Sequence, residues 1–175
     1  MSKCLAIIDV QNDFVDGSLG TSEAQAMLPS LVEYASAFEG RIVFTKGTHF
    51  SNYLETPEGK ALPVKHCIKG THGWELASAL SDLALKRHCR IYEKNVFGSV
   101  KLARDLKSLY EHGKIDEVEL CGLCTDICVI ANAVLIHTLC PKLPLLVNSK
   151  CCAGVTPQKH QSALDVMASL QIKVI

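Results

Sequence analysis

The sequence predicts an α/β protein built as a three-layer sandwich, in which a six-stranded, mostly parallel sheet lies between two layers of helices. Short apolar segments alternate along the chain with longer segments in which apolar residues recur at helical spacing. A regular alternation of strand and helix favours a parallel sheet with helices on both faces. No linker, repeat or low-complexity tract interrupts the 175 residues, so we expect one domain that spans residues 1–175.

Six segments are expected to form the strands. The first, residues 5–8, is continuously apolar, which is typical of a strand buried on both faces. The fourth, residues 117–122, alternates between apolar and polar residues and then turns at a glycine. The remaining candidates are short apolar segments at residues 41–45, 90–92, 143–147 and 172–175.

Helical periodicity separates these strands. Thr156 is suited to cap the last helix, with Pro157 at its first position. The segment 125–139 is apolar nearly all round, which favours a helix buried in the core or in the interface of a homo-oligomer. The five expected helices cover residues 23–38, 74–85, 100–110, 125–139 and 157–170.

Composition narrows the possible functions. The chain carries 18 basic and 18 acidic side chains, and this balance argues against a dedicated nucleic-acid binder. No apolar run approaches the roughly 20 residues of a membrane helix, so we expect no membrane association. The nine cysteines are odd in number and no secretion signal precedes them, which favours free thiols in a reducing compartment such as the cytoplasm.

Candidate functional residues follow the predicted strands, because ligands of open parallel sheets bind beyond the carboxyl ends of the strands. Asp9 ends the first strand, where a partly desolvated carboxyl group can act as a base. The alternative is a structural acid that caps a neighbouring loop. Lys94 ends the third strand, where a lysine is tolerated if it pairs with a carboxylate. The alternative is a surface lysine whose aliphatic part covers apolar surface.

Cys128 follows the fourth strand. The segment 122–128 reads as a strand, a glycine turn and the start of a helix, with Thr125 as a suitable N-cap. This spacing places Cys128 in the first helical turn, where the helix dipole favours a thiolate and free N–H groups can hold an oxyanion. The alternative is one more buried thiol, and the spacing by itself leaves both interpretations open.

His49 and His66 are candidate metal ligands. Both lie in the longest irregular stretch, residues 47–73, and a loop of that length is usually functional. Two imidazoles and a carboxylate, for which Glu55 and Glu58 are available nearby, suit zinc or a similar divalent ion. The irregular spacing is equally compatible with polar loop histidines that bind nothing.

Several ordered segments together resemble the isochorismatase-like cysteine hydrolases, and most closely their nicotinamidase-like branch. The first is Ile8 to Phe14, which matches a D-x-Q-x-D-F start, and the nucleophile loop of the family is similar to residues 122–129. The resemblance extends over nearly the whole chain. The other matching segments are residues 48–49, 62–67, 70–71, 94 with 97–98, and 151–156.

This resemblance implies a Rossmann-like fold and a catalytic triad of Asp9, Lys94 and Cys128. In such enzymes the aspartate takes the thiol proton and the lysine supports the charge pair. The thiolate then attacks an amide carbonyl, ammonia leaves, and water releases the acid from the thioester. The resemblance also implies a cis peptide at Leu123–Cys124, with the N–H groups of Cys124 and Cys128 as oxyanion donors.

It further implies a divalent metal site, from which this sequence departs at one position. The histidine positions match His49 and His66, but the usual aspartate is Gly47 and the usual aromatic residue is Thr48. Loss of a charged ligand should weaken binding of a zinc-like ion, unless Glu55 or Glu58 replaces it. The substrate pocket is expected to include three residues of the matching segments, Gln11, Phe14 and Phe97.

Three hypotheses follow. The first is a nicotinamidase-like amidohydrolase that acts on a small carboxamide through a thioester. The second, motivated by Gly47, is a metal-free hydrolase of an N-carbamoyl compound or of a vinyl ether like isochorismate. The third is a non-catalytic ligand-binding or scaffold member of the family, which the presence of Asp9, Lys94 and Cys128 disfavours.

Overall fold

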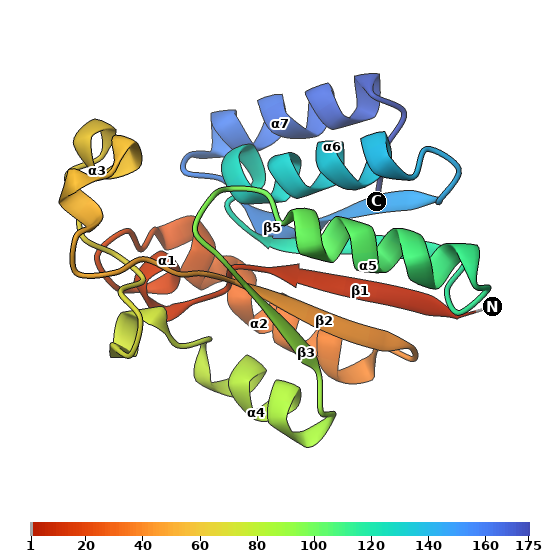
Figure 1. The fold of residues 1–175 in the computed structure, drawn as a ribbon, viewed down its shortest axis with the longest axis horizontal. Helices are drawn as coiled ribbons and strands as arrows, with labels where there is room; N and C mark the ends of the chain where they lie inside the picture. The colour runs from red at the N-terminus through yellow and green to blue at the C-terminus, as the bar shows by residue number, and fades with distance from the viewer. Residues whose placement is uncertain (1) are drawn as a thin grey trace.

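The computed structural model describes residues 2–175 and confirms the α/β sandwich (Figure 1). Within this range the sheet has six strands in the order β3-β2-β1-β4-β5-β6, and every pairing is parallel, so the sheet is more regular than the mostly parallel one expected. The strands are β1 (Lys3–Ile8), β2 (Arg41–Gly47), β3 (Arg90–Lys94), β4 (Glu117–Leu123), β5 (Leu145–Ala153) and β6 (Lys173–Val174).

Helices cover both faces of the sheet. α2 contacts α4 on one face, whereas α5, α6 and α7 pack in sequence on the other (Figure 1). Two short helices, α1 and α3, lie with the loops beyond the carboxyl ends of the strands. The bounds are α1 (Asn12–Val15), α2 (Ser22–Ala37), α3 (Pro57–Ala61), α4 (Ser78–Lys86), α5 (Val100–Glu111), α6 (Ile130–Leu139) and α7 (Pro157–Ser169).

The predicted strand β1 forms the centre of the core. All residues from Cys4 to Ile8 have no exposed surface, because β1 pairs with β2 and β4 and is covered by helices on both sides. The α7 start is also as predicted: Pro157 is the first helical residue, and the Thr156 hydroxyl accepts a hydrogen bond from the Lys159 N–H. The polar residues at the carboxyl ends of the strands are therefore attached to a buried apolar core.

Three of the predicted elements differ most from the structure in their boundaries. The helix expected at residues 74–85 begins at Ser78, because His72–Trp74 forms a separate 3₁₀ turn. The helix expected at residues 125–139 begins with a π-helical turn, Thr125–Val129, before α6. The strand expected at residues 143–147 continues to Ala153 across a register shift beside β4, which alternation alone did not reveal.

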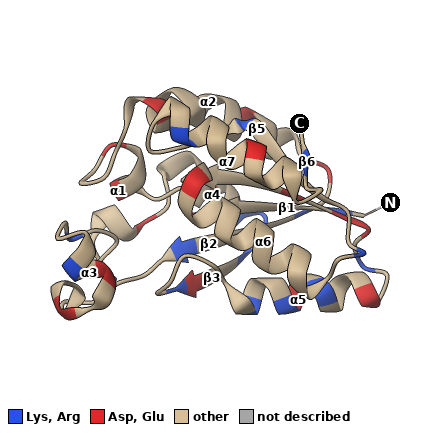
Figure 2. Ribbon diagram, turned by 90° about the horizontal axis from the view of Figure 1, so that it is seen from above, with Lys and Arg blue, Asp and Glu red and all other residues tan. Residues whose placement is uncertain are grey.

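Charged residues are distributed over the surface. Acidic and basic side chains are interspersed on surface helices such as α3 and α5, in keeping with the balanced composition (Figure 2). Of the helices within residues 2–175, none combines the length and the hydropathy that a bilayer span requires.

Candidate active site

The structure brings Asp9, Lys94 and Cys128 together at the carboxyl ends of the strands. The Lys94 Nζ atom lies 2.5 Å from Asp9 Oδ2 and 3.6 Å from Cys128 Sγ. All three residues are buried, and Asp9 has no exposed surface. A carboxylate and an ammonium group in such a position are tolerated because they form a pair. Lys94 Nζ therefore lies in contact with both the carboxylate and the sulfur, and the expected grouping of the three side chains is present.

The backbone at Asp9 holds its carboxylate in a defined orientation. Asp9 has a φ of +47°, a left-handed conformation that costs an L-residue about 1 kcal/mol. Thr45 of β2 stabilises it, since its hydroxyl accepts a hydrogen bond from the Asp9 N–H (3.1 Å) and donates one to Asp9 Oδ1 (2.6 Å). A strained residue held by its neighbours is typical of functional sites. The sequence did not single out Thr45, because a threonine inside an apolar strand is unremarkable.

The surroundings of Cys128 act on its pKa in opposite directions. Burial raises the pKa of the Cys128 thiol well above its usual value, the Asp9 carboxylate raises it further, and Lys94 only partly opposes them. Burial lowers the pKa of Lys94, but the charges and hydrogen bonds of Asp9 and Cys128 outweigh it, so the pKa ends above its usual value. The direction of this shift favours the thiol form of Cys128, whereas the helix start favours the thiolate.

The segment that carries Cys128 is anchored from two sides. Cys124, rather than the expected Thr125, is the N-cap residue, and its carbonyl accepts hydrogen bonds from the N–H groups of Ile127 and Val129. The peptide bond Leu123–Cys124 is cis, as the family resemblance implies. The Thr125 hydroxyl is instead hydrogen-bonded to His160 Nδ1 of α7 at 2.8 Å. The first turns of α7 thus fix the position of the Cys128 turn.

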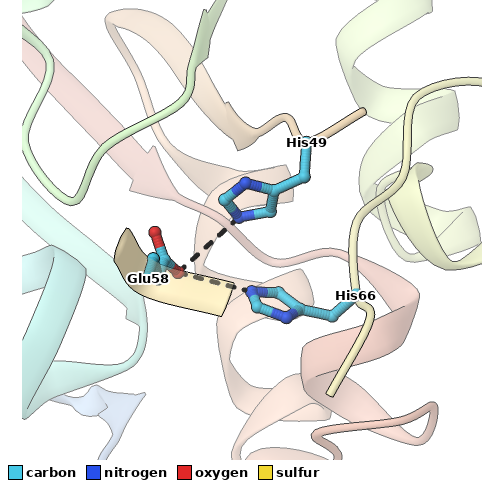
Figure 3. Close-up of side chains that lie close together, drawn as sticks. All are labelled: His49, Glu58 and His66. Carbon is cyan, nitrogen blue, oxygen red and sulfur yellow. Dashed lines mark ion pairs between the residues drawn. The ribbon is translucent and has the colours of Figure 1, made fainter. Parts of the chain in front are cut away.

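His49, Glu58 and His66 form a separate cluster in the same pocket (Figure 3). The Nε2 atoms of both histidines lie 3.7 Å from Glu58 Oε1, and the candidate ligand atoms of the three residues lie within 4.8 Å of one another. The predicted histidines therefore do converge, and Glu58, not Glu55, joins them. The sequence could not choose between these glutamates, because the choice depends on how the short helix α3 folds back.

The chemistry of this cluster suits a divalent cation. Burial, followed by the charges of His66 and Lys94, lowers the pKa of His49 to about 4, so its imidazole is neutral at pH 7. His66 Nδ1 is hydrogen-bonded to the Val64 carbonyl at 2.8 Å, which leaves Nε2 directed to Glu58. Neutral imidazole nitrogens with one carboxylate are a typical zinc donor set.

Comparison with known proteins shows the family of the chain. The isochorismatase domain family matches residues 3–175. The chain belongs to the isochorismatase family. A nicotinamidase/pyrazinamidase of Mycobacterium tuberculosis is 26% identical over 190 residues, which cover 99% of this chain and 98% of that protein.

Solved structures of this family have the same fold. The nicotinamidase/pyrazinamidase PncA of Bacillus subtilis is 30% identical, with a TM-score of 0.86 and 99% of each chain covered. A pyrazinamidase of Pyrococcus horikoshii, solved in complex with zinc, is 24% identical, with a TM-score of 0.79 over 100% of this chain and 99% of that one. The relatives named as nicotinamidases favour neither the hydrolase of an N-carbamoyl compound or vinyl ether nor the non-catalytic hypothesis.

Two of the three residues expected to line the pocket of this isochorismatase-family protein do so. Phe14 and Phe97 are both in the pocket wall that also contains Asp9 and Cys128. Gln11 is fully buried behind that wall: its Nε2 donates to the carbonyls of Gly47 and Trp74, and its Oε1 accepts from the Gly47 N–H at 2.7 Å. The structure therefore gives Gln11 a supporting position instead of the expected substrate contact, because its amide groups are already bonded.

Asn132 of α6 connects the loop after β3 to the turn of Cys128. Its Nδ2 donates to the carbonyls of Cys128 (2.8 Å) and Phe97 (3.2 Å), and its Oδ1 accepts from the Ser99 N–H at 2.9 Å. The side chain is 1% exposed, so water does not replace these bonds easily. No sequence pattern indicated this role, since the surrounding helix is almost entirely apolar.

Replacing Asn132 with leucine is expected to lower the free energy of unfolding by about 2–4 kcal/mol. Leucine keeps the branching of asparagine at Cγ, but three main-chain groups, two of them in buried hydrogen bonds, lose their partner. Each buried loss costs about 1–3 kcal/mol before relaxation. Urea denaturation followed by circular dichroism measures the change. An unchanged unfolding midpoint and slope would show that these hydrogen bonds contribute nothing.

Proposed function

We propose that this protein is a cysteine amidohydrolase of the nicotinamidase type, which releases ammonia from a small primary carboxamide through a thioester on Cys128. The observation that carries the proposal is the contact of one ammonium group, Lys94 Nζ, with both the Asp9 carboxylate and the Cys128 sulfur inside a pocket. The family relationship supports the same reaction class, because relatives along nearly the whole chain are named as nicotinamidases.

The first half of the reaction begins from the thiol. Asp9 accepts the Cys128 proton as Sγ attacks the carbonyl carbon, and Lys94 stabilises the anionic pair that forms. The N–H groups of Cys124 and Cys128 donate to the oxyanion of the tetrahedral intermediate. The C–N bond then breaks, the nitrogen takes the proton from Asp9, and ammonia leaves.

The second half regenerates the enzyme. A water molecule gives a proton to Asp9 as its oxygen attacks the thioester carbonyl, and Lys94 again balances the negative charge. Collapse of this intermediate breaks the C–S bond. The sulfur recovers the proton from Asp9, and the carboxylic acid leaves the pocket. A protonated thiol between turnovers is consistent with the raised pKa of Cys128, for which burial is the largest cause.

A zinc-like ion would be held by His49, Glu58 and His66. Their two imidazoles and single carboxylate fit the preferences of such an ion, even though Gly47 supplies no side chain. When bound, the ion supplies a Lewis-acidic contact for a donor atom of the substrate. The protein residues themselves position the amide, since Phe14 and Phe97 form the apolar walls of the same pocket.

Replacing Glu58 with alanine is expected to weaken zinc binding at least about 10-fold, because one of the three available donor groups is lost. Zinc content after purification without chelator, and competition with a chromogenic chelator, measure the effect. Glu55→Ala is the matched control, since Glu55 lies three residues away and outside the cluster. Equal zinc retention by the Glu58→Ala and wild-type proteins would remove Glu58 from the site.

The proposed reaction is tested by measuring ammonia release from a panel of primary carboxamides that includes nicotinamide and pyrazinamide. Acid quenching followed by mass spectrometry should reveal the acyl group on the peptide that contains Cys128. Cleavage of N-carbamoyl compounds or a vinyl ether, with all carboxamides refused, would replace the proposal by the second hypothesis. Absence of turnover with every compound would favour the non-catalytic hypothesis.

We also propose that the whole chain is one isochorismatase-like domain that assembles as a homo-oligomer in the cytoplasm. The helix α6 supports assembly, because Val134 is 38% exposed and its apolar neighbours Ile130, Ala131 and Leu135 are only partly buried. All nine cysteines within the described part of the chain are free thiols, which supports a reducing compartment. Sedimentation velocity tests the assembly.

A further inference from the structure

A large groove opens directly from the candidate catalytic pocket. It has a volume of about 780 Å³, against about 70 Å³ for the pocket around Asp9, Lys94 and Cys128. The groove lies within the size range of small-molecule sites, and one aromatic ring would leave most of it filled with water. A small carboxamide bound at Cys128 therefore uses only part of the available space.

The two cavities share a wall, so a single molecule can occupy both. Leu62, Val96, Phe97 and Ile127 line the pocket and the groove alike. Ile127 directly precedes Cys128 in the chain, and the Val96 carbonyl accepts a hydrogen bond from Lys94 Nζ at 3.2 Å. The groove thus begins beside the reacting groups and not at a remote surface.

The groove is predominantly apolar, and its side chains are left exposed. Phe50, Leu62, Val96 and Phe97 are each at least 40% exposed, although they lie close together on loops. On the far side, Pro57 and Ala61 of α3 close the groove. Adjoining apolar side chains that are open to solvent are typical of a surface that binds an apolar group.

The position of Asp9 decides which part of an amide substrate can enter the groove. In the proposed reaction the amide nitrogen must approach Asp9 to collect its proton, and Asp9, Thr45 and Lys94 are all buried there. A substituent on the nitrogen would meet this closed side of the pocket. The acyl part of the substrate instead points away from Asp9, past His49 and Glu58, which line both cavities.

From this geometry we propose that the enzyme acts on primary carboxamides whose acyl group carries an extended apolar substituent, and that the groove between α3 and residues 95–97 binds that substituent. The proposal rests on the proposed amidohydrolase function and adds the class of substrate to it. The occupant of the groove is the acyl substituent of the substrate, because the wall of the groove is continuous with that of the reacting site.

The test compares pyridine-3-carboxamides that carry hydrogen, n-butyl or phenyl at each open ring carbon, together with N-butyl nicotinamide. For the wild-type enzyme, at least one extended primary amide should show a kcat/KM about 10-fold or more above that of nicotinamide, since burying several methylene groups strengthens binding. N-butyl nicotinamide should be hydrolysed at least about 100-fold less efficiently than nicotinamide, because crowding displaces the amide from its reactive geometry.

Ala61→Trp fills the groove without touching the pocket. It should lower kcat/KM for the extended amides about 10-fold or more and leave that for nicotinamide within about 2-fold. Lys60→Trp is the matched control, because Lys60 precedes Ala61 in α3, is exposed and does not line the groove. It should leave both values unchanged.

Distinct results contradict the inference and the proposed function. Turnover of nicotinamide without any gain for the extended amides would overturn the inference alone, and so would equal losses for small and extended amides in Ala61→Trp. If a second copy of the chain fills the groove, the extended amides are refused and Ala61→Trp changes the sedimentation coefficient, which also overturns it. Failure to hydrolyse any carboxamide, small ones included, would overturn the proposed function and this inference with it.

Discussion

Replacing Cys128 with alanine is expected to reduce ammonia release from any carboxamide substrate by at least about 10⁴-fold. The sulfur is the only protein nucleophile that the proposed reaction uses, and its loss removes the covalent path entirely. The side chain is 7% exposed and small, so its removal should leave the fold intact. The measurement is steady-state ammonia release, with circular dichroism to confirm folding.

Eight other cysteines make a matched control possible. Cys89 is half-buried near the start of β3, and it is not among the residues that line the pocket around Cys128. Cys89→Ala should therefore keep activity within about 2-fold of the wild-type enzyme, since surface substitutions far from a site have small effects. Equal rates for Cys128→Ala and wild type would exclude Cys128 from the mechanism.

A methyl group at Gly122 is expected to lower the free energy of unfolding by at least about 3 kcal/mol. A Cβ atom there would lie 2.2 Å from the Ile8 carbonyl oxygen and 2.7 Å from the Ile8 nitrogen, both in the backbone of β1. Gly122 also has a φ of +118°, which L side chains rarely adopt. Overpacking and backbone strain therefore act together. Urea denaturation of Gly122→Ala measures the loss.

Gly113→Ala serves to separate the effect of overpacking from that of backbone strain. Gly113 also has a positive φ, +64°, but no atom lies within 4 Å of the position of its Cβ. We expect this variant to lose only about 1 kcal/mol, the strain component alone. If both variants lost the same amount, the contact of Gly122 with β1 would have no energetic weight. Because Asp9 follows Ile8, Gly122→Ala should also lose most of its activity.

The part of the fold that could be predicted is the part dictated by periodicity. Strand β1 was recognisable because its residues are apolar on both faces, and the α7 start because Thr156 and Pro157 favour that boundary. The convergence of Asp9 and Lys94 followed from the rule that ligands bind at the carboxyl ends of parallel strands. These features depend on local sequence and on one topological rule.

The remaining features depend on contacts between distant segments. Glu58 joins the histidines only because α3 folds back over the pocket, and no spacing rule distinguishes it from Glu55. Gln11 belongs to a segment that matches the family, yet its side chain is hydrogen-bonded to the backbone of Gly47 behind the pocket wall. A π-helical turn stands at Cys128 in place of the expected α-helix start, and Thr125 is bonded to His160 instead of capping it. Sequence patterns contain no information on these pairings.

The burial of Cys128 has a consequence for oxidative damage. Peroxides and alkylating reagents react with thiolates that they can reach, and Cys128 is only 7% exposed. A bound amide would cover the sulfur further, and a thioester leaves no free thiol. A saturating supply of amide should therefore protect the enzyme from hydrogen peroxide, and equal inactivation with and without amide would contradict this expectation.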